Sequence, residues 1–404
     1  MKIVLFVENN HCGGMDTFFA NLINYWPHAE DEFILIGNYD HPGLPNIARA
    51  LVRPCRIIGH RIPLNWQIAG ALFGWLPRLP RRAMQLIFRF LLLPLQFRQM
   101  RRLFETLGGD RLLVVNGAYP GGESCRIASI VWGKMGRLPG IHNIRNFAMA
   151  PRPLTGWFEN WMDRQVVENT HCFIGVSRSC AESLRSRPAC RRLDNIRHIY
   201  NGVRTEREIP ASTVNLRDKL GIGNAPMCLM LGTYEPRKGH RFLFEAFLRV
   251  QQGVPEAHLV ICGHGTPDEV AAVETLRRTI APGAHIHLLE FIPGGSGLIA
   301  QADVLAIASQ EWESFGWTAI EAMSLGVAVV STNSGGLAEV VGPDGESGFC
   351  VPPDDVEGYA HRLSVLLRDA EMRKFLGAKG RERMLKMFTV ERMVGEYAEI
   401  VRAP

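Results

Sequence analysis

The sequence predicts an α/β protein of two domains, each built on a parallel sheet that helices cover on both faces. Its 404 residues exceed what one ordinary hydrophobic core accommodates. In both halves, short continuous apolar runs alternate with helical patterns, which is typical of parallel strands buried on both sides. Hydrophobic residues make up 47% of the chain and charged residues 21%, so a folded globular protein is expected throughout.

The first half contains four apolar runs that we expect to be strands. The run Ile3–Val7 is followed by the loop His11–Gly14 and by a helical pattern that continues to Pro27. The other three strands are expected at 33–36, 112–115 and 172–176. Ser177 follows the last of them and is placed to cap the next helix.

The second half repeats this order of elements. Strands are expected at 228–231, 258–262, 285–289, 304–308 and 327–330, with helices at about 240–250 and 390–401. The halves meet near Asn201-Gly202-Val203, which a polar stretch at 204–212 follows. We therefore predict a first domain at 1–203, a second at 204–385, and a C-terminal helix at 386–404 that packs back toward the first.

Cysteine usage and hydropathy favour a reducing, cytoplasmic setting. The nine cysteines are scattered and none forms a C-x-x-C pair, so free thiols are expected, with neither a disulfide framework nor a zinc site. The apolar run at the N-terminus is too short for a signal peptide. No run of about 18 apolar residues occurs, so no transmembrane helix is expected.

The net charge of +5 is concentrated in one segment. Residues 41–104 hold eleven arginines and no Asp, Glu or Lys, so the rest of the chain carries 5 − 11 = −6. Within it, apolar residues accompany the arginines of a helical pattern that Pro94 interrupts; the arginines concerned are Arg78, Arg82, Arg89, Arg98, Arg101 and Arg102. One interpretation is a basic surface at 78–102 that contacts anionic lipid. The other is an internal helix pair whose arginines extend to water. Nucleic acid is not expected, because no aromatic platform is interleaved with the charge.

A motif with two glutamates lies between two predicted strands of the second half. Glu313 precedes the turn Ser314-Phe315-Gly316, and Glu321 lies two turns into the helix that follows. The C-terminal ends of strands are where open α/β sheets bind ligands, and the N–H groups of a helix start favour an anion such as a diphosphate. Glu313 would then accept hydrogen bonds from sugar hydroxyls, and Glu321 from a ribose diol. The alternative is that both are solvated helix charges.

Two further motifs follow neighbouring predicted strands. Arg237 and Lys238 provide adjacent cations that can neutralise a diphosphate and stabilise a leaving group. Gly263 and Gly265 permit close backbone approach to a ligand. An ordinary surface turn is the alternative for the two cations, and packing is the expected role of the cysteines, Trp312 and Trp317.

With these motifs in order, the chain resembles the retaining glycosyltransferases of family 4. The most specific part is Glu-x7-Glu from Glu313 to Glu321, in the context Glu-Ser-Phe-Gly…Glu-Ala-Met-Ser-Leu-Gly. Gly13-Gly14 after the first strand, Ile199–Val203 at the junction and Gly335-Gly336…Glu339 also match. The resemblance covers nearly the whole chain. It implies the GT-B fold, in which two Rossmann-like domains face each other across an active-site cleft.

The resemblance also implies residue roles. Glu313 would hold donor-sugar hydroxyls together with the Phe315 and Gly316 backbone, and Glu321 would bind the ribose. The residues that would bind the rest of the donor are Gly13, Gly14, Arg237, Lys238, Gly263, Gly265, Phe291, Ile292 and Thr318. His142, expected just after a short strand, matches a histidine that contacts the donor sugar. A tight turn at Gly13-Gly14 and a structural role for His142 are the alternatives.

One departure from the family pattern is Thr233, where many members carry an arginine; here Arg237 and Lys238 supply the cations. The implied reaction is front-face displacement with retention, without cofactor or metal, from a nucleotide-sugar donor to a glycan or lipid-linked acceptor in surface polysaccharide synthesis. The expected location is the cytoplasm or the inner face of the membrane. Competing functions of the same fold are a nucleotide-sugar 2-epimerase and a catalytically silent binding protein.

Overall fold

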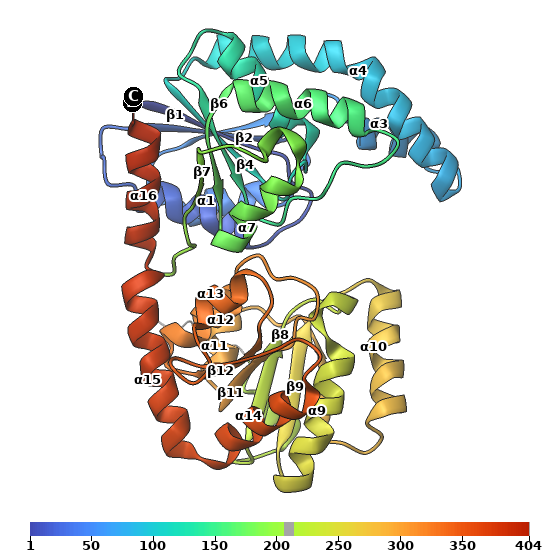
Figure 1. Ribbon diagram of the computed structural model, residues 1–404, viewed down its shortest axis with the longest axis vertical. Coiled ribbons are helices and arrows are strands. Elements are labelled where there is room, and N and C mark those ends of the chain that lie inside the picture. Colours follow the sequence, from blue (N-terminus) through green and yellow to red (C-terminus); the bar gives the residue numbers. More distant parts are fainter. Residues whose placement is uncertain (206–213, 404) are drawn as a thin grey trace. The chain divides into compact units, whose positions relative to one another are not determined.

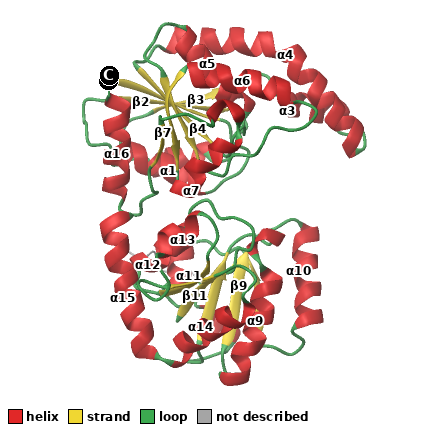
Figure 2. Ribbon diagram, viewed as in Figure 1, coloured by secondary structure: helices red, strands yellow, loops and turns green. Residues whose placement is uncertain are grey.

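The computed structural model describes residues 1–205 and 214–403, except for the side chain of Arg78. The chain forms two compact units, and each has a central sheet with helices outside it (Figures 1 and 2). Unit 1 comprises Met1–Ile199 and Val394–Pro404, and unit 2 comprises Tyr200–Met393. Residues 206–212 of the polar stretch predicted at the domain junction lie outside the described residues.

Unit 1 is built on a seven-stranded sheet in the order β3-β2-β1-β4-β5-β6-β7, with all neighbouring strands parallel. Its strands are β1 (Lys2–Val7), β2 (Glu32–Asn38), β3 (Arg56–His60), β4 (Arg111–Asn116), β5 (Gly140–Ile144), β6 (Thr170–Gly175) and β7 (Ile196–His198). Its helices are α1 (Gly14–Asn24), α2 (Leu44–Ala50), α3 (Asn65–Phe73), α4 (Arg78–Leu107), α5 (Glu123–Lys134), α6 (Gly156–Glu168), α7 (Arg178–Ser183) and most of α16 (Val390–Arg402), with short 3₁₀ turns at Leu184–Ser186 and Pro188–Cys190.

Two neighbouring residues of β5 show which helices cover which face of this sheet. Successive side chains of a strand point to opposite faces. The ring of His142 contacts Ser129 on α5, whereas Asn143 donates to the hydroxyl of Tyr397 on α16 at 2.8 Å. Tyr397 in turn packs edge-on against Phe18 of α1. Helix α5 therefore covers one face with α4 and α6, and α16 covers the other with α1 (Figure 1).

Unit 2 has a six-stranded parallel sheet in the order β10-β9-β8-β11-β12-β13. Its strands are β8 (Met227–Leu231), β9 (His258–Gly263), β10 (Ile286–Glu290), β11 (Val304–Ile307), β12 (Ala328–Thr332) and β13 (Phe349–Val351). Its helices are α8 (Leu216–Leu220), α9 (His240–Gly253), α10 (Pro267–Ile280), α11 (Gly295–Ile299), α12 (Trp317–Ser324), α13 (Gly336–Val341), α14 (Val356–Arg368) and α15 (Ala370–Met387), with a 3₁₀ turn at Pro236–Lys238.

The α/β prediction with parallel sheets is confirmed, and each strand expected from an apolar run is present. Ser177 caps α7 as predicted, since its hydroxyl accepts from the amide of Cys180. The predicted interruption at Pro94 is wrong, because α4 continues through it. Pro94 cannot donate a backbone hydrogen bond, but it is exposed, and the buried Met100 and the partly buried Phe90 anchor the helix on either side of it.

Candidate active site

A cavity of about 340 Å³ lies in unit 2 at the C-terminal ends of its central strands. The order of the strands reverses between β8 and β11, and such a switch point is where open α/β sheets bind ligands. The cavity is lined by the loops that follow β8, β9, β10 and β11 and by the start of α12. Eight residues predicted from the sequence to bind the donor line it: Arg237, Lys238, Gly263, Phe291, Ile292, Glu313, Gly316 and Thr318.

Lys238 and Glu313 form the charged centre of this cavity. The Nζ of Lys238 lies 2.5 Å from Oε2 of Glu313, and the side chains are only 17% and 16% exposed. Ser309 donates to the same carboxylate oxygen at 3.2 Å, and a guanidinium nitrogen of Arg237 lies 3.7 Å away. The two motifs are 75 residues apart in sequence. They meet because β8 and β11 are paired in the sheet.

Arg237 is held by two residues that the sequence analysis did not assign to the site. Its Nε donates to Glu235 at 2.6 Å, and its guanidinium lies 4.8 Å from the ring centre of Trp312. Burial raises the pKa of Glu235, but hydrogen bonds from Arg237 and Thr233 outweigh burial and leave this pKa below its usual value. Trp312 therefore does more than the packing predicted for it. Glu235 could have been assigned to the site from the sequence, because it stands two residues before Arg237.

The start of α12 forms one end of the cavity. Gly316 is the N-cap of this helix and has φ of 103°, a conformation that L-residues avoid. A Cβ at this position would lie 2.6 Å from Cδ1 of Leu337, so space also requires glycine. The preceding Phe315 is 1% exposed, and its ring packs against Tyr200 and Phe388. This packing holds the turn in place. The first N–H groups of α12 consequently point out of a rigid turn.

The ends of β8 and β9 and the loop after β10 form another part of the cavity wall. A Cβ at Gly263 would lie 1.7 Å from the carbonyl oxygen of Gly232, so glycine lets the ends of β8 and β9 approach closely. Phe291 is exposed and meets the ring of His264 edge-on at 5.9 Å. Trp317, predicted to be a packing residue, also lines the cavity. The exposed rings of Phe291 and His264, beside apolar strand ends, suit the flat face of a nucleobase.

The other predicted donor residues lie outside the lining of this cavity. Gly265 follows Gly263 by two residues, and a Cβ there would lie 3.0 Å from Cβ of Tyr234. Glu321 is half-buried on α12, one turn beyond Trp317. Gly13 and Gly14 belong to unit 1, where they are exposed at the start of α1 and the amide of Gly13 donates to Asp16. Contact of these residues with a donor stays a prediction.

His142 requires a correction, because the structure places it in the middle of β5 and not after a strand. It is 0% exposed, its Nδ1 lies 2.9 Å from the hydroxyl of Ser129, and its Nε2 lies 3.4 Å from Asn116. Burial, and secondarily the charge of Arg126, lowers its pKa from 6.5 to about 3. His142 is thus a neutral, hydrogen-bonded residue of the core of unit 1 and does not line a ligand site there.

Neither a metal site nor a membrane-spanning helix is found among the described residues. No group of three or more His, Cys, Asp or Glu side chains is placed to hold a metal ion among those residues. No helix in the described ranges has both the length and the apolar character needed to cross a bilayer.

Comparison with known proteins connects this geometry to an enzyme family. Residues 213–383 match the family "Glycosyl transferases group 1". A putative glycosyltransferase of Bacillus subtilis, EpsD, is 26% identical over 322 residues, which cover 76% of this chain and 80% of that protein. A GDP-mannose-dependent α-(1-6)-phosphatidylinositol monomannoside mannosyltransferase of Mycolicibacterium smegmatis is 31% identical over 199 residues, 46% of this chain and half of that protein.

Solved structures show the same fold over the whole chain. HepE of Anabaena, in complex with UDP and glucose, superimposes with a TM-score of 0.74 at 18% identity and covers all of both chains. A glycosyltransferase of Rickettsia africae gives a TM-score of 0.75 at 16% identity over 99% of this chain and 97% of that one. The chain is therefore a glycosyltransferase with the GT-B fold, and its residues 213–383 form a glycosyl transferases group 1 domain.

Proposed function

We propose that the protein transfers a hexose from a nucleotide diphosphate sugar to a glycan or lipid-linked acceptor with retention of anomeric configuration, as family 4 enzymes do. The observation that carries the proposal is the meeting of Arg237, Lys238 and Glu313 in one cavity beside the start of α12. Two cations and a helix N-terminus provide positive charge for a diphosphate. The carboxylate beside them supplies acceptors for sugar hydroxyls. UDP in HepE and GDP-mannose in the mannosyltransferase support a nucleotide sugar as donor.

The reaction follows from this distribution of charge. As the bond between the anomeric carbon and the phosphate oxygen breaks, negative charge grows on the diphosphate, where Lys238 and Arg237 stabilise it. The acceptor hydroxyl forms its bond on the same face of the sugar and passes its proton to the departing phosphate oxygen. The products are a nucleoside diphosphate and a glycoside. We assign no covalent nucleophile, because Glu313 is occupied by Lys238 and Ser309. We also propose that these cations balance the diphosphate without a metal ion.

We propose further that unit 1 contacts an anionic membrane surface. Exposed apolar side chains gather along α3, α4 and the start of α6; we call the set Leu72, Trp75, Leu79, Leu91, Leu154 and Trp157 the α4 surface. Trp75 is 80% and Leu79 78% exposed, and a group of such exposed apolar side chains is typical of a surface that contacts a membrane or another protein. The stacking of Phe90 on Trp157 joins α4 to α6. Exposed arginines on α4 accompany the apolar residues, as in interfacial helices. Arg89 is not among them, because it is buried against Glu123.

A donor panel tests the proposal. The protein is incubated with UDP-, GDP- and ADP-sugars, and thermal stability and nucleotide release are measured. One base should stabilise the protein, by about 2.7 kcal/mol at a hundredfold excess over Kd. Release should depend on an acceptor, and the product should be a glycoside of unchanged anomeric configuration. Absence of stabilisation by every nucleotide would contradict the proposed donor site, and an epimerised free sugar nucleotide would identify the competing reaction.

A further inference from the structure

Unit 1 contains a second large cavity, of about 770 Å³, that the donor site does not use. It lies where the strand order of the first sheet reverses, between β1 and β4. Glu8 directly follows β1, and Gly121 belongs to the loop after β4. Residues from α3, α4, the start of α5 and the segment before α6 complete the lining. The cavity thus occupies the switch point of unit 1, where a ligand site is expected in an open parallel sheet.

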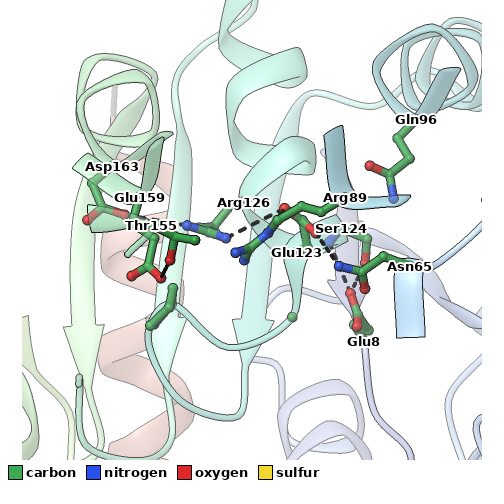
Figure 3. Close-up of polar contacts among 12 residues, drawn as sticks. Glu8, Asn65, Arg89, Gln96, Glu123, Ser124, Arg126, Thr155, Glu159 and Asp163 are labelled. Atoms are coloured by element: carbon green, nitrogen blue, oxygen red, sulfur yellow. Dashed lines mark hydrogen bonds and ion pairs between the residues drawn. The ribbon is translucent and has the colours of Figure 1, made fainter. Parts of the chain in front are cut away.

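The inner wall of this cavity is polar and firmly held. Glu8 accepts hydrogen bonds from the amide and hydroxyl of Ser124, at 3.0 and 2.6 Å, and from the indole of Trp66 at 3.3 Å. Burial raises the pKa of Glu8 despite these bonds, and the charge of Glu123 adds to the effect. Glu123 accepts from Asn65 at 3.0 Å (Figure 3). Carboxylates and an amide beside an indole are the groups that recognise sugar hydroxyls and the apolar face of a sugar ring.

A buried ionic network fixes that wall from behind. Arg89 pairs with Glu123 at 2.7 Å, and Arg126 lies between Glu123 and Asp163, at 3.9 and 3.7 Å (Figure 3). Arg187 continues the network from Asp163 to Glu159, where Thr155 of the cavity wall also donates. The three arginines and three carboxylates of this network balance one another, so the network adds no net charge at the back of the cavity. A ligand anion must therefore be bound elsewhere on the wall.

Two arginines on the outer part of the wall have no such neutralisation. Arg82 of α4 and Arg152 line the cavity and are exposed, and neither has a carboxylate partner in the described part of the chain. Leu154, also in the lining, is 89% exposed and belongs to the α4 surface. The cavity therefore has a hydroxyl-binding inner wall, two cations further out, and an apolar surface beside its opening.

We propose that this cavity binds the acceptor as a sugar phosphate ester, with the sugar hydroxyls at Glu8, Glu123 and Asn65 and the phosphate at Arg82 and Arg152. The inference rests on the proposed function, since it names the acceptor of that reaction. Arginine suits the phosphate because its planar fork forms paired charge-assisted hydrogen bonds. A soluble sugar phosphate and a lipid-linked one share this chemistry, and the neighbouring α4 surface leads us to expect the lipid-linked form to bind more tightly.

Calorimetric binding to the full-length protein, without nucleotide, tests the proposal. Three probes are compared: glucose 1-phosphate, decyl diphosphate-linked glucose, and octyl glucoside as the neutral counterpart. Arg82→Gln combined with Arg152→Gln should weaken binding of both phosphate probes at least about tenfold and leave octyl glucoside unaffected. Arg164→Gln combined with Arg192→Gln is the matched control, since it removes two exposed arginines of unit 1 outside the cavity. Glu8→Gln should weaken all three probes.

The outcomes separate this proposal from the proposed function. Lys238→Ala should leave phosphate binding unchanged, because it alters only the donor site; if it abolishes that binding instead, the probes occupy the donor site and the proposal is wrong. Equal loss in the cavity and control variants would also overturn it. Tighter binding of the decyl probe supports a lipid-linked acceptor, and equal binding of both phosphate probes supports a soluble one. Failure of nucleotides to stabilise the protein would contradict the donor site alone.

Discussion

Oε2 of Glu313 lies 2.5 Å from Nζ of Lys238, so the carboxylate proposed to bind the sugar and the cation proposed to bind the diphosphate neutralise each other. In the proposed reaction, the donor diphosphate would compete with Glu313 for the lysine and so release the carboxylate toward the sugar. This exchange predicts opposite effects for the two residues on nucleotide binding, although both are needed for transfer.

Lys238→Ala should lower kcat about 100-fold or more, because the diphosphate loses a buried charge-assisted donor as its negative charge grows. Thermal unfolding should change little, since Arg237 and Ser309 still contact Glu313. Steady-state rates and melting temperature are measured on the same preparations. Lys374→Ala, which removes an exposed lysine of unit 2, is the control. Full turnover by the Lys238 variant would remove it from the active site.

Glu313→Gln should slow transfer by a similar factor and yet bind the free nucleoside diphosphate at least as tightly as the parent protein. The amide keeps the shape of the carboxylate but no longer competes for Lys238. Calorimetry with the preferred nucleoside diphosphate, beside kcat, checks both parts. Weaker binding of that nucleotide would contradict the competition between Glu313 and phosphate.

Gly316→Ala should destabilise unit 2 by about 1–3 kcal/mol, because the new methyl group must displace Leu337 and the backbone has positive φ. Affinity for the nucleoside diphosphate should fall with it, since the first N–H groups of α12 shift. Gly395→Ala is a matched control: Gly395 lies inside α16 with no atom within 4 Å of the added methyl group, so this change should be neutral or stabilising. Similar losses in both variants would argue against a specific role of the turn.

The stability of unit 1 should fall on mild acidification because of His142. Its pKa is about 3 in the folded protein, against 6.5 as the ordinary value. At a pH between these two values, the His142 imidazole binds a proton in the unfolded chain but stays neutral in the folded protein. The free energy of unfolding thus falls by up to about 1.4 kcal/mol for each unit of decreasing pH below 6.5. Urea unfolding between pH 4 and 7 measures this slope.

His142→Gln should reduce that slope and leave the contribution of His60, whose pKa burial lowers to about 4. Ser129→Ala should keep the slope while lowering stability at every pH. Because His142 is a core residue, folded His142→Gln protein should retain most of its kcat at pH 7. A loss of turnover at unchanged stability would restore a direct role in the reaction. An unchanged slope in the glutamine variant would contradict the neutral state inferred for the imidazole.

Flotation with vesicles tests the α4 surface. Trp75→Ser combined with Leu91→Ser should reduce recovery with vesicles that contain 30% anionic phospholipid, because two exposed apolar anchors are lost. Binding by the parent protein should weaken as salt rises. Leu385→Ser, at an exposed apolar position on α15, is the control. Recovery that ignores both lipid charge and the paired substitution would favour the internal-helix interpretation of the basic segment.

The sequence predicted the central strands well because both of their faces are buried, which leaves an uninterrupted apolar run. The strands it did not identify include β3, β7 and β13, which lie at sheet edges where pairing is one-sided. Only a short apolar pattern remains there; β7, for instance, is Ile196–His198 with Arg197 exposed.

The sequence likewise predicted some residues of the candidate site and missed others. Residues at or soon after the end of a strand line the cavity as the order of motifs indicated; Gly263 is the last residue of β9, and Lys238 lies in the 3₁₀ turn that follows β8. The prediction placed His142 after a strand, whereas it lies inside one. The neighbouring Ile141 and Ile144 fit either position, so they could not distinguish the two. Ser309 and the contact of Arg237 with Trp312 depend on side-chain directions that spacing alone does not specify.

The closing helix of unit 1 also has a consequence for biosynthesis. Arg111 is fully buried at the start of β4, and its guanidinium donates to the carbonyls of Ile400 and Ala403. Those carbonyls leave the ribosome almost 300 residues after the arginine, when all of unit 2 has already been translated. Unit 1 therefore cannot complete its core as the nascent chain emerges. It must wait, partly assembled, until the segment that contains Ile400 and Ala403 has been translated.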